Sequence, residues 1–168
     1  AESRIKMNEL AKHAIKSILD YSAEGKESET DFDNCAEEVI SIIGEASRNK
    51  NIGFAVFKPT GVARFALLEK VSAIKARGKG QGIEDCSVKL TEIEQQEFDR
   101  VQERFNRICK TAHDAGVAVF IDAEESWIQC AVDEMVNAMM FSYNREKPIV
   151  FNTFQMYRRD RLEYLKEC

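Results

Sequence analysis

The stretch Val117-Ala118-Val119-Phe120-Ile121-Asp122-Ala123-Glu124-Glu125-Ser126-Trp127 is the part of the sequence that decides the fold. Its apolar residues run directly into an acidic cluster, and a helical pattern follows. A short apolar run without alternation is typical of a parallel strand that is covered on both faces. The first charge, Asp122, therefore marks the strand's C-terminal end, where parallel barrels build their active sites.

Three more apolar segments end on a polar residue in the same way. Because parallel strands present their C-terminal ends at one edge of a sheet, we expect these residues to share one rim with Asp122. They are Asp20, Lys58 and Asn152, which follow residues 17–19, 54–57 and 148–151.

Helical patterns separate these strands, and the strict alternation predicts right-handed parallel β/α units. We predict an α/β fold with one domain over residues 1–168, forming about half of a TIM (β/α)8 barrel. A complete barrel needs ~250 residues. We therefore expect a fragment, or the ordered part, of a longer enzyme, or a half barrel that association completes. The expected helices cover residues 1–16, 30–46, 64–74, 91–116 and 127–139, and a short one carries Leu162 and Leu165.

Local signals set several boundaries. Thr30 with Asp33, and Thr91 with Glu94, have the spacing of helix N-terminal caps. Pro59 lacks a backbone donor and disfavours helical backbone at Lys58, so we expect an extended Lys58 whose ammonium is held at the strand's mouth.

Composition excludes several classes of protein. The net charge of −5 and the scattered Lys and Arg residues argue against a nucleic-acid partner. No stretch approaches the ~20 apolar residues of a membrane span, and the N-terminus lacks the apolar core of a signal peptide. Five widely spaced cysteines favour reduced structural thiols in a cytoplasm-like compartment over disulfides or zinc.

The predicted rim allows several kinds of chemistry. A desolvated Lys58 would be a Schiff-base nucleophile, as an aldolase requires, whereas a protonated Lys58 would bind a substrate carboxylate while Asp122 positions another cation. Asp122, Glu124 and Glu125 are potential magnesium ligands, but adjacent residues on an extended strand diverge, so a metal is disfavoured. Finally, Lys58 and Asp122 could merely neutralise each other.

At these residues the sequence resembles the proline dehydrogenase family of FAD-dependent (β/α)8 barrel enzymes. The resemblance extends over the chain from about residue 10, and two segments together make it fairly specific: Asp-Ala-Glu and Phe-Asn-Thr-Phe-Gln. The matching segments are Ile18-Leu-Asp-Tyr-Ser-Ala-Glu24, Ala55-Val-Phe-Lys-Pro-Thr-Gly61, Ile121-Asp-Ala-Glu-Glu-Ser-Trp127 and Val150-Phe-Asn-Thr-Phe-Gln155.

The resemblance implies oxidation of L-proline to Δ1-pyrroline-5-carboxylate, with hydride transfer to FAD and reoxidation by a membrane quinone. Together with the cysteine usage, which indicates a cytoplasmic location, this leaves peripheral contact with the inner membrane open. By the same resemblance, Lys58 contacts the substrate carboxylate and Asp122 orients the other substrate-binding groups. Asp20 belongs to the same pocket, and Glu24 pairs with a carboxylate-binding arginine when the site closes.

For the cofactor, the resemblance places Asn152 at the flavin ring, with Gln155 as a weaker match. The family's other FAD contacts and its paired-arginine motif come from later strands and the last helix, beyond residue 168. The charged run 158–161 is instead expected to form a solvated helix face.

Two expectations follow from half a barrel. The isolated chain should bind FAD poorly and turn over no proline. Its two unpaired sheet edges, and one sheet face without a partner layer, should promote self-association. A lysine aldolase of similar fold and a non-catalytic interaction fragment are the competing functions.

Overall fold

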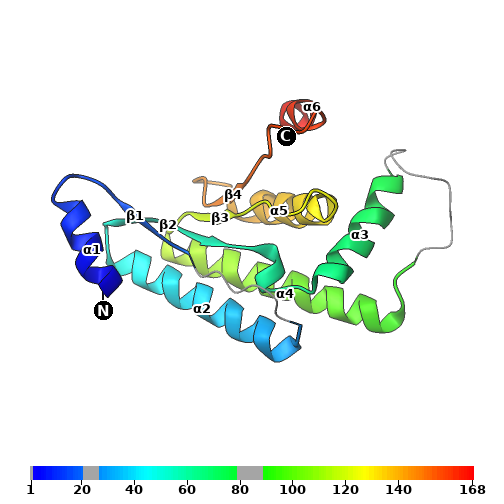
Figure 1. The fold of residues 1–168 in the computed structure, drawn as a ribbon, viewed down its shortest axis with the longest axis horizontal. Coiled ribbons are helices and arrows are strands. Elements are labelled where there is room, and N and C mark those ends of the chain that lie inside the picture. Colours follow the sequence, from blue (N-terminus) through cyan, green and yellow to red (C-terminus); the bar gives the residue numbers. More distant parts are fainter. Residues whose placement is uncertain (1, 21–26, 79–88) are drawn as a thin grey trace.

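The computed structural model describes residues 2–20, 27–78 and 89–168. Strands and helices alternate along most of the chain, as predicted (Figure 1). The elements are α1 (Glu2–Ala11), β1 (Ser17–Asp20), α2 (Glu29–Arg48), β2 (Ile52–Phe57), the 3-10 turn η1 (Pro59–Gly61), α3 (Phe65–Gly78), α4 (Glu92–Ala115), β3 (Val119–Ile121), α5 (Gln129–Tyr143), β4 (Val150–Asn152) and α6 (Arg161–Glu167).

The four strands form one sheet in the order β1-β2-β3-β4, and every neighbouring pair is parallel. Asp20 pairs with Val56. Phe57 pairs with Ile121, which pairs in turn with Asn152. This confirms the predicted parallel α/β architecture and brings the C-terminal strand ends to one edge.

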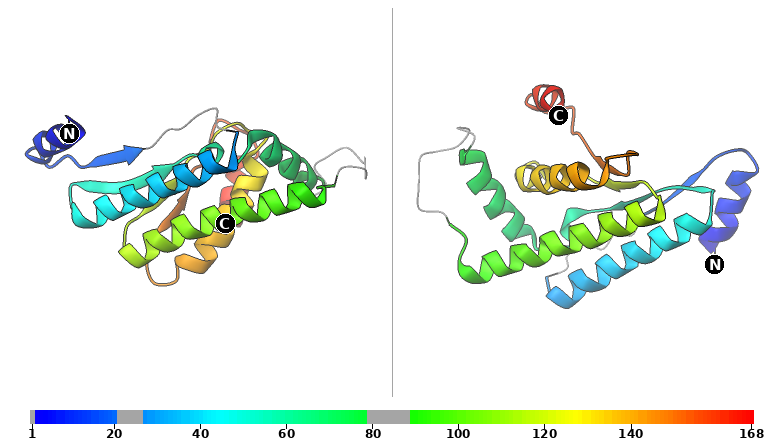
Figure 2. Two further views of the ribbon diagram at one scale, coloured as in Figure 1. Left: turned by 90° about the horizontal axis from the view of Figure 1, so that it is seen from below. Right: turned by 180° about the vertical axis from the view of Figure 1, so that it is seen from behind.

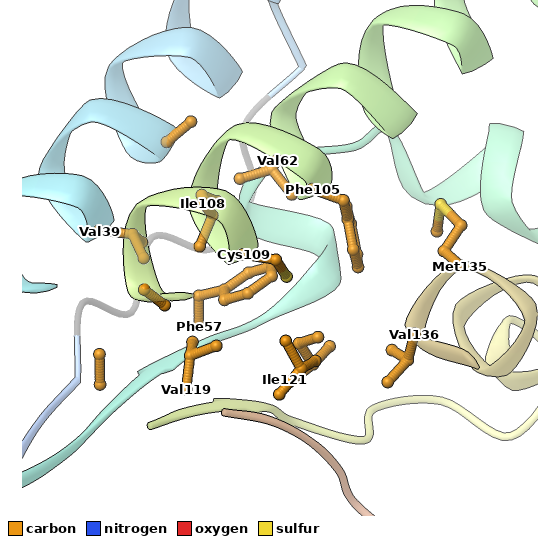
Figure 3. Packing of buried hydrophobic residues seen from close by; sticks show 14 of the residues in the cluster. Val39, Phe57, Val62, Phe105, Ile108, Cys109, Val119, Ile121, Met135 and Val136 are labelled. Carbon is orange, nitrogen blue, oxygen red and sulfur yellow. The ribbon is translucent and has the colours of Figure 1, made fainter. Parts of the chain in front are cut away.

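One face of the sheet packs against helices α2, α4 and α5 (Figure 3). Phe57, Val119 and Ile121 point to this side and are at most 1% exposed. The Phe57 ring meets Phe105 of α4 edge-on at 5.2 Å. Burying a phenylalanine of this kind stabilises the fold by about 2–3 kcal/mol. Figure 2 shows α2 and α4 running alongside each other across this face.

The other face of the sheet carries an aromatic cluster. Side chains alternate along a strand, so Phe54, Phe120 and Phe151 lie opposite the helix-facing residues. Phe54 and Phe120 stack at 4.4 Å between ring centroids, and Phe151 meets Phe120 edge-on at 5.1 Å. All three stay half-buried. This face therefore lacks a full covering layer, as expected of half a barrel, and the expectation of strands fully covered on both faces is wrong. In a closed barrel this is the interior face, which needs side chains from further strands to fill it.

Helix ends agree only in part with the sequence. The Thr91–Glu94 capping box opens α4, and Gly116 ends it in the left-handed conformation at φ 66°, as predicted. The predicted cap of α2 at Thr30 is wrong, because Ser28 Oγ accepts the backbone N–H of Asp31 instead.

Helix α1 is shorter than predicted. It ends at Ala11, and the backbone then turns through Ala14 at a positive φ of 58°. Met7 is buried, but Ile5 and Ile15 are more than half exposed. The chain's start is therefore less amphipathic than its spacing suggested, and Figure 1 places α1 at the margin of the sheet beside β1.

Cys35 and Cys109 are buried in the core, and no disulfide joins the described cysteines; Cys86 lies outside the described residues. Burial raises the pKa of the Cys109 thiol to about 12, which leaves it unreactive. Among the described helices, none combines the length and the apolar character needed to cross a membrane.

Candidate active site

Lys58 and Asp122 lie on adjacent strand ends at the same edge of the sheet. The backbone N–H of Asp122 donates to the carbonyl of Phe57 at 3.0 Å, which continues the ladder between β2 and β3 up to the rim. Strand alternation then places Lys58 on the face of Phe54 and Asp122 on the face of Phe120. Both side chains are half-buried beside the aromatic cluster. A cation and an anion thus converge around an apolar surface.

The backbone at Lys58 is extended, with φ −97° and ψ 134°, as the following proline predicted. The short turn η1 follows at once and closes with a hydrogen bond from Val62 N–H to the Pro59 carbonyl at 3.1 Å. Lys58 is therefore the last extended residue before the chain turns over the rim.

Of the two further candidate residues, Asp20 and Glu24, the structure describes only the backbone of Asp20. The backbone of Asp20 pairs with Val56 at the same edge of the sheet. Glu24 lies outside the described residues.

Glu124 connects the loops around the rim. Its carboxylate accepts the Thr60 backbone N–H at 2.8 Å and the Thr60 hydroxyl at 2.6 Å. The side-chain amide of Gln155, from the loop after β4, donates to the Glu124 backbone carbonyl. The sequence suggested only a metal-ligand role for Glu124. Its position two residues after Asp122, like that of Thr60 after Lys58, is the signal that could have paired them.

Acidic side chains do not gather into a metal site in the part of the chain that the structure describes. Glu125 is exposed, and Glu124 is engaged by Thr60. The Asp122 carboxylate accepts its neighbour's backbone N–H, from Ala123, at 3.0 Å.

Asn152 faces the helices, in line with its pairing to Ile121. Its amide donates to the carboxylate of Asp133 on α5 at 2.9 Å, and its oxygen accepts the backbone N–H of Thr153 at 2.9 Å. The tip of β4 is thus attached to the helix layer through Asp133.

Arg161 completes the cluster around Asp133. It is 3% exposed and donates two hydrogen bonds to the Asp133 carboxylate, at 2.6 and 3.0 Å. The prediction of a solvated helix face at residues 158–161 is therefore wrong for Arg161. Desolvation opposes its charge, but its hydrogen bonds to Asp133 and the attraction of that carboxylate and other nearby groups outweigh this penalty and raise the pKa of the Arg161 guanidinium. The predicted short helix at Leu162 and Leu165 is α6, and both leucines are exposed.

The proline dehydrogenase family model matches residues 3–168 of this sequence. The chain belongs to the proline dehydrogenase family. This confirms the family that the four strand-end segments predicted.

Two curated relatives show how much of a related protein this chain spans. It is 33% identical over 159 residues to the carbapenem antibiotics biosynthesis protein CarD of Pectobacterium carotovorum subsp. carotovorum, covering 95% of this chain and 39% of that protein. It is 30% identical over 190 residues to mitochondrial proline dehydrogenase 1 of Dictyostelium discoideum, covering 99% of this chain and 33% of that protein. The chain therefore spans between a third and two fifths of these relatives.

A solved structure shares the fold of this family member. Proline utilization A from Bdellovibrio bacteriovorus, inactivated by N-propargylglycine, superposes with a TM-score of 0.72 at 12% sequence identity. The match covers 99% of this chain and 17% of that one. The half-barrel arrangement of parallel β/α units is thus a known fold.

A cavity of about 620 Å³ lies away from Lys58. It is lined by residues of α3, α5 and α6, including Gln129, Asp133 and Arg161, and by the loop residue Trp127. Neither Lys58 nor Asp122 lines it. Trp127 is 54% exposed, and its ring meets Phe65 edge-on at 6.4 Å.

Proposed function

We propose that this chain supplies part of an active site that oxidises L-proline to Δ1-pyrroline-5-carboxylate. The observation that carries the proposal is the shared rim of Lys58 and Asp122 beside the aromatic face of the sheet. L-Proline has a carboxylate, a ring nitrogen and an apolar ring. A cation, an anion and an apolar wall are the matching partners.

In this proposal, Lys58 binds the substrate carboxylate through a charge-assisted hydrogen bond. Asp122 holds the groups that face the ring nitrogen, and Asp20 and Glu24 complete the substrate pocket. The half-buried rings of Phe54 and Phe120 offer the apolar surface against which the pyrrolidine ring packs.

The side-chain oxygen of Gln155 is suited to contact a flavin cofactor. Its Nε2 donates a hydrogen bond to the Glu124 carbonyl, but its Oε1 is buried and has no hydrogen-bond partner among the described residues. A carbonyl oxygen of this kind accepts N–H groups, and the flavin ring carries one. Asn152 donates one of its two amide hydrogens to Asp133, which leaves the other as a second candidate contact. Bound FAD would supply the acceptor for the hydride that leaves proline.

The remaining assignments follow from this activity. We propose that a membrane quinone accepts the electrons, through peripheral contact of a cytoplasmic enzyme with the inner membrane. We further propose that residues 1–168 alone bind FAD poorly, turn over no proline and self-associate. These properties are tested separately from the role of Lys58.

The test is substitution of Lys58 by alanine in the protein with its natural flanking sequence. Loss of a hydrogen bond to a charged group costs about 1.5–3 kcal/mol, so kcat/KM for L-proline should fall roughly 10- to 150-fold. Proline-dependent dye reduction measures this. The matched control is Lys50→Ala, because Lys50 is exposed and precedes the opposite end of β2.

Two experimental outcomes would contradict the proposal and support a different function. Unchanged proline oxidation in both Lys58→Ala and Asp122→Asn would favour a non-catalytic interaction fragment. Borohydride trapping of a carbonyl compound on Lys58 would favour the lysine aldolase.

A further inference from the structure

We infer that Glu124 is a positioning residue, which holds Lys58 in place for the substrate by tying together the loops after β2, β3 and β4. The inference rests on the proposed role of Lys58. It adds a residue that acts through another, without touching proline itself.

Glu124 and Thr60 lie far apart in the sequence but are joined by two short hydrogen bonds. The residues are 64 positions apart, and both carboxylate oxygens are used, one on the Thr60 N–H at 2.8 Å and one on its hydroxyl at 2.6 Å. Hydrogen bonds to an ionised acceptor are about twice as strong as neutral ones. Thr60 is therefore held by its backbone and its side chain at once.

Although Pro59, Gly61 and Val62 are buried, the backbone of this segment makes few other hydrogen bonds to the rest of the described chain. At one end of the turn, Phe57 is in the sheet. At the other end, buried Arg104 donates to the Val62 carbonyl at 3.3 Å. Between them, Gly61 and Val62 donate only to Lys58 and Pro59 within the turn, and Pro59 has no N–H to donate. Thr60 is thus the residue through which this segment is attached to the β3 loop.

Gln155 extends the connection to β4. Its side-chain amide donates to the backbone carbonyl of Glu124, so the residue that holds Thr60 is itself held from the next loop. Three loops of the rim are linked in series through Glu124. A shift of the Glu124 carboxylate would be passed to Lys58, two residues before Thr60.

The experiment uses the protein with its natural flanking sequence and three variants. Glu124→Gln keeps the size of the side chain but removes its charge. Thr60→Val removes the hydroxyl, and Thr60→Ser retains it as the matched control. We expect Glu124→Gln and Thr60→Val to raise KM for L-proline roughly five- to ten-fold with a smaller change in kcat, and Thr60→Ser to remain near wild type.

Hydrogen–deuterium exchange gives a readout that needs no turnover. Amide exchange over residues 57–62 should rise in Glu124→Gln and Thr60→Val and stay unchanged in Thr60→Ser. Lower thermal stability with an unchanged KM in both variants would overturn the inference, since it would show a purely structural contact. If Glu124→Gln fails to fold, the KM and the amide exchange of Thr60→Val alone test the inference.

A double-mutant cycle separates this inference from the proposed function. If Glu124 acts through Lys58, Glu124→Gln should add little to KM in a Lys58→Ala background. Equal, independent effects of the two substitutions would overturn the positioning role while leaving Lys58 as a substrate contact. An unchanged KM in Lys58→Ala would instead overturn the proposed function, and with it the basis of this inference.

Discussion

Asp133 joins three elements through one carboxylate. It accepts hydrogen bonds from Gln129 on its own helix, Asn152 at the tip of β4 and Arg161 of α6. The side chains of Asp133 and Arg161 are 8% and 4% exposed. A buried ion pair costs desolvation energy when it forms, but losing one partner leaves a charge without compensation.

Substitution of Arg161 by methionine should therefore destabilise the chain by about 3 kcal/mol. Urea unfolding measures the change. Arg159→Met is the matched control, because Arg159 is exposed two residues away. The double variant Arg161→Met with Asp133→Leu should recover most of the loss, since no buried charge remains. Equal stability of Arg161→Met and Arg159→Met would contradict the prediction.

The sequence could not reveal the burial of Arg161. Its partner lies 28 positions earlier on α5, and its local surroundings, Arg158-Arg159-Asp160, are typical of a solvated surface. Lys58 and Asp122 were predictable, because each directly follows an apolar strand and strand direction fixes which edge they reach. Glu124 and Thr60 were missed because a side-chain bond between loops leaves no periodic pattern.

At the scale of elements, the N-terminus of α4 is connected to α3. Glu94 accepts the Thr91 backbone N–H at 2.7 Å in the capping box and also binds Lys70 of α3 at 2.7 and 2.8 Å. The bonds from Lys70 and then Thr91 lower the pKa of Glu94 from 4.5 to about 2. One carboxylate thus caps one helix and attaches it to another.

This low pKa predicts acid sensitivity. The folded state holds the Glu94 carboxylate ionised, so its contribution to stability is complete above the unfolded pKa of about 4.5 and is lost as the pH falls towards 2. The thermal midpoint of Glu94→Gln should accordingly differ most from wild type at pH values above 5 and converge with it in acid. The control is Glu92→Gln, because Glu92 is exposed and lies two residues earlier in the same turn of α4. A constant difference between Glu94→Gln and wild type at all pH values would refute the assignment.

The N-termini of α2 and α4 show when the local sequence is sufficient to predict a helix cap. Thr91 and Glu94 satisfy each other within α4, so their spacing alone identified the cap. Ahead of α2, Ser28 with Asp31 and Thr30 with Asp33 have the same spacing. Ser28 is the cap, while Asp33 binds Arg104 of α4 at 2.7 Å. A tertiary contact decided between two locally equal choices.

At the scale of the whole molecule, the sheet is open. In the described part of the chain, β1 and β4 each pair with a strand on one side only. The alternation of strands and helices was enough to predict the parallel order, because each unit is encoded locally. A face without a partner layer was predicted from the half barrel, but the stacking of Phe54 on Phe120 across that face was not, since a ring contact between strands leaves no local signal in the sequence.

Exposed edges and a half-covered face predict that residues 1–168 alone associate into dimers or larger species. Light scattering at tens of micromolar measures the mass. Ile18→Lys should shift the population towards monomer, because Ile18 is 52% exposed on the edge strand β1 and a lysine discourages pairing. Ile93→Lys, at a 76% exposed position on α4, should not. A monomeric wild-type chain would disprove the prediction.

The loop that joins β3 to α5 has a property with practical use. It carries the sole tryptophan of the sequence, Trp127, in the same short segment as Asp122 and Glu124. Its indole is 54% exposed to water, and the wavelength of indole fluorescence depends on contact with water. The natural chain therefore contains an intrinsic fluorophore on the loop that leads away from its candidate active site, and optical titrations can follow changes in that loop without any added dye.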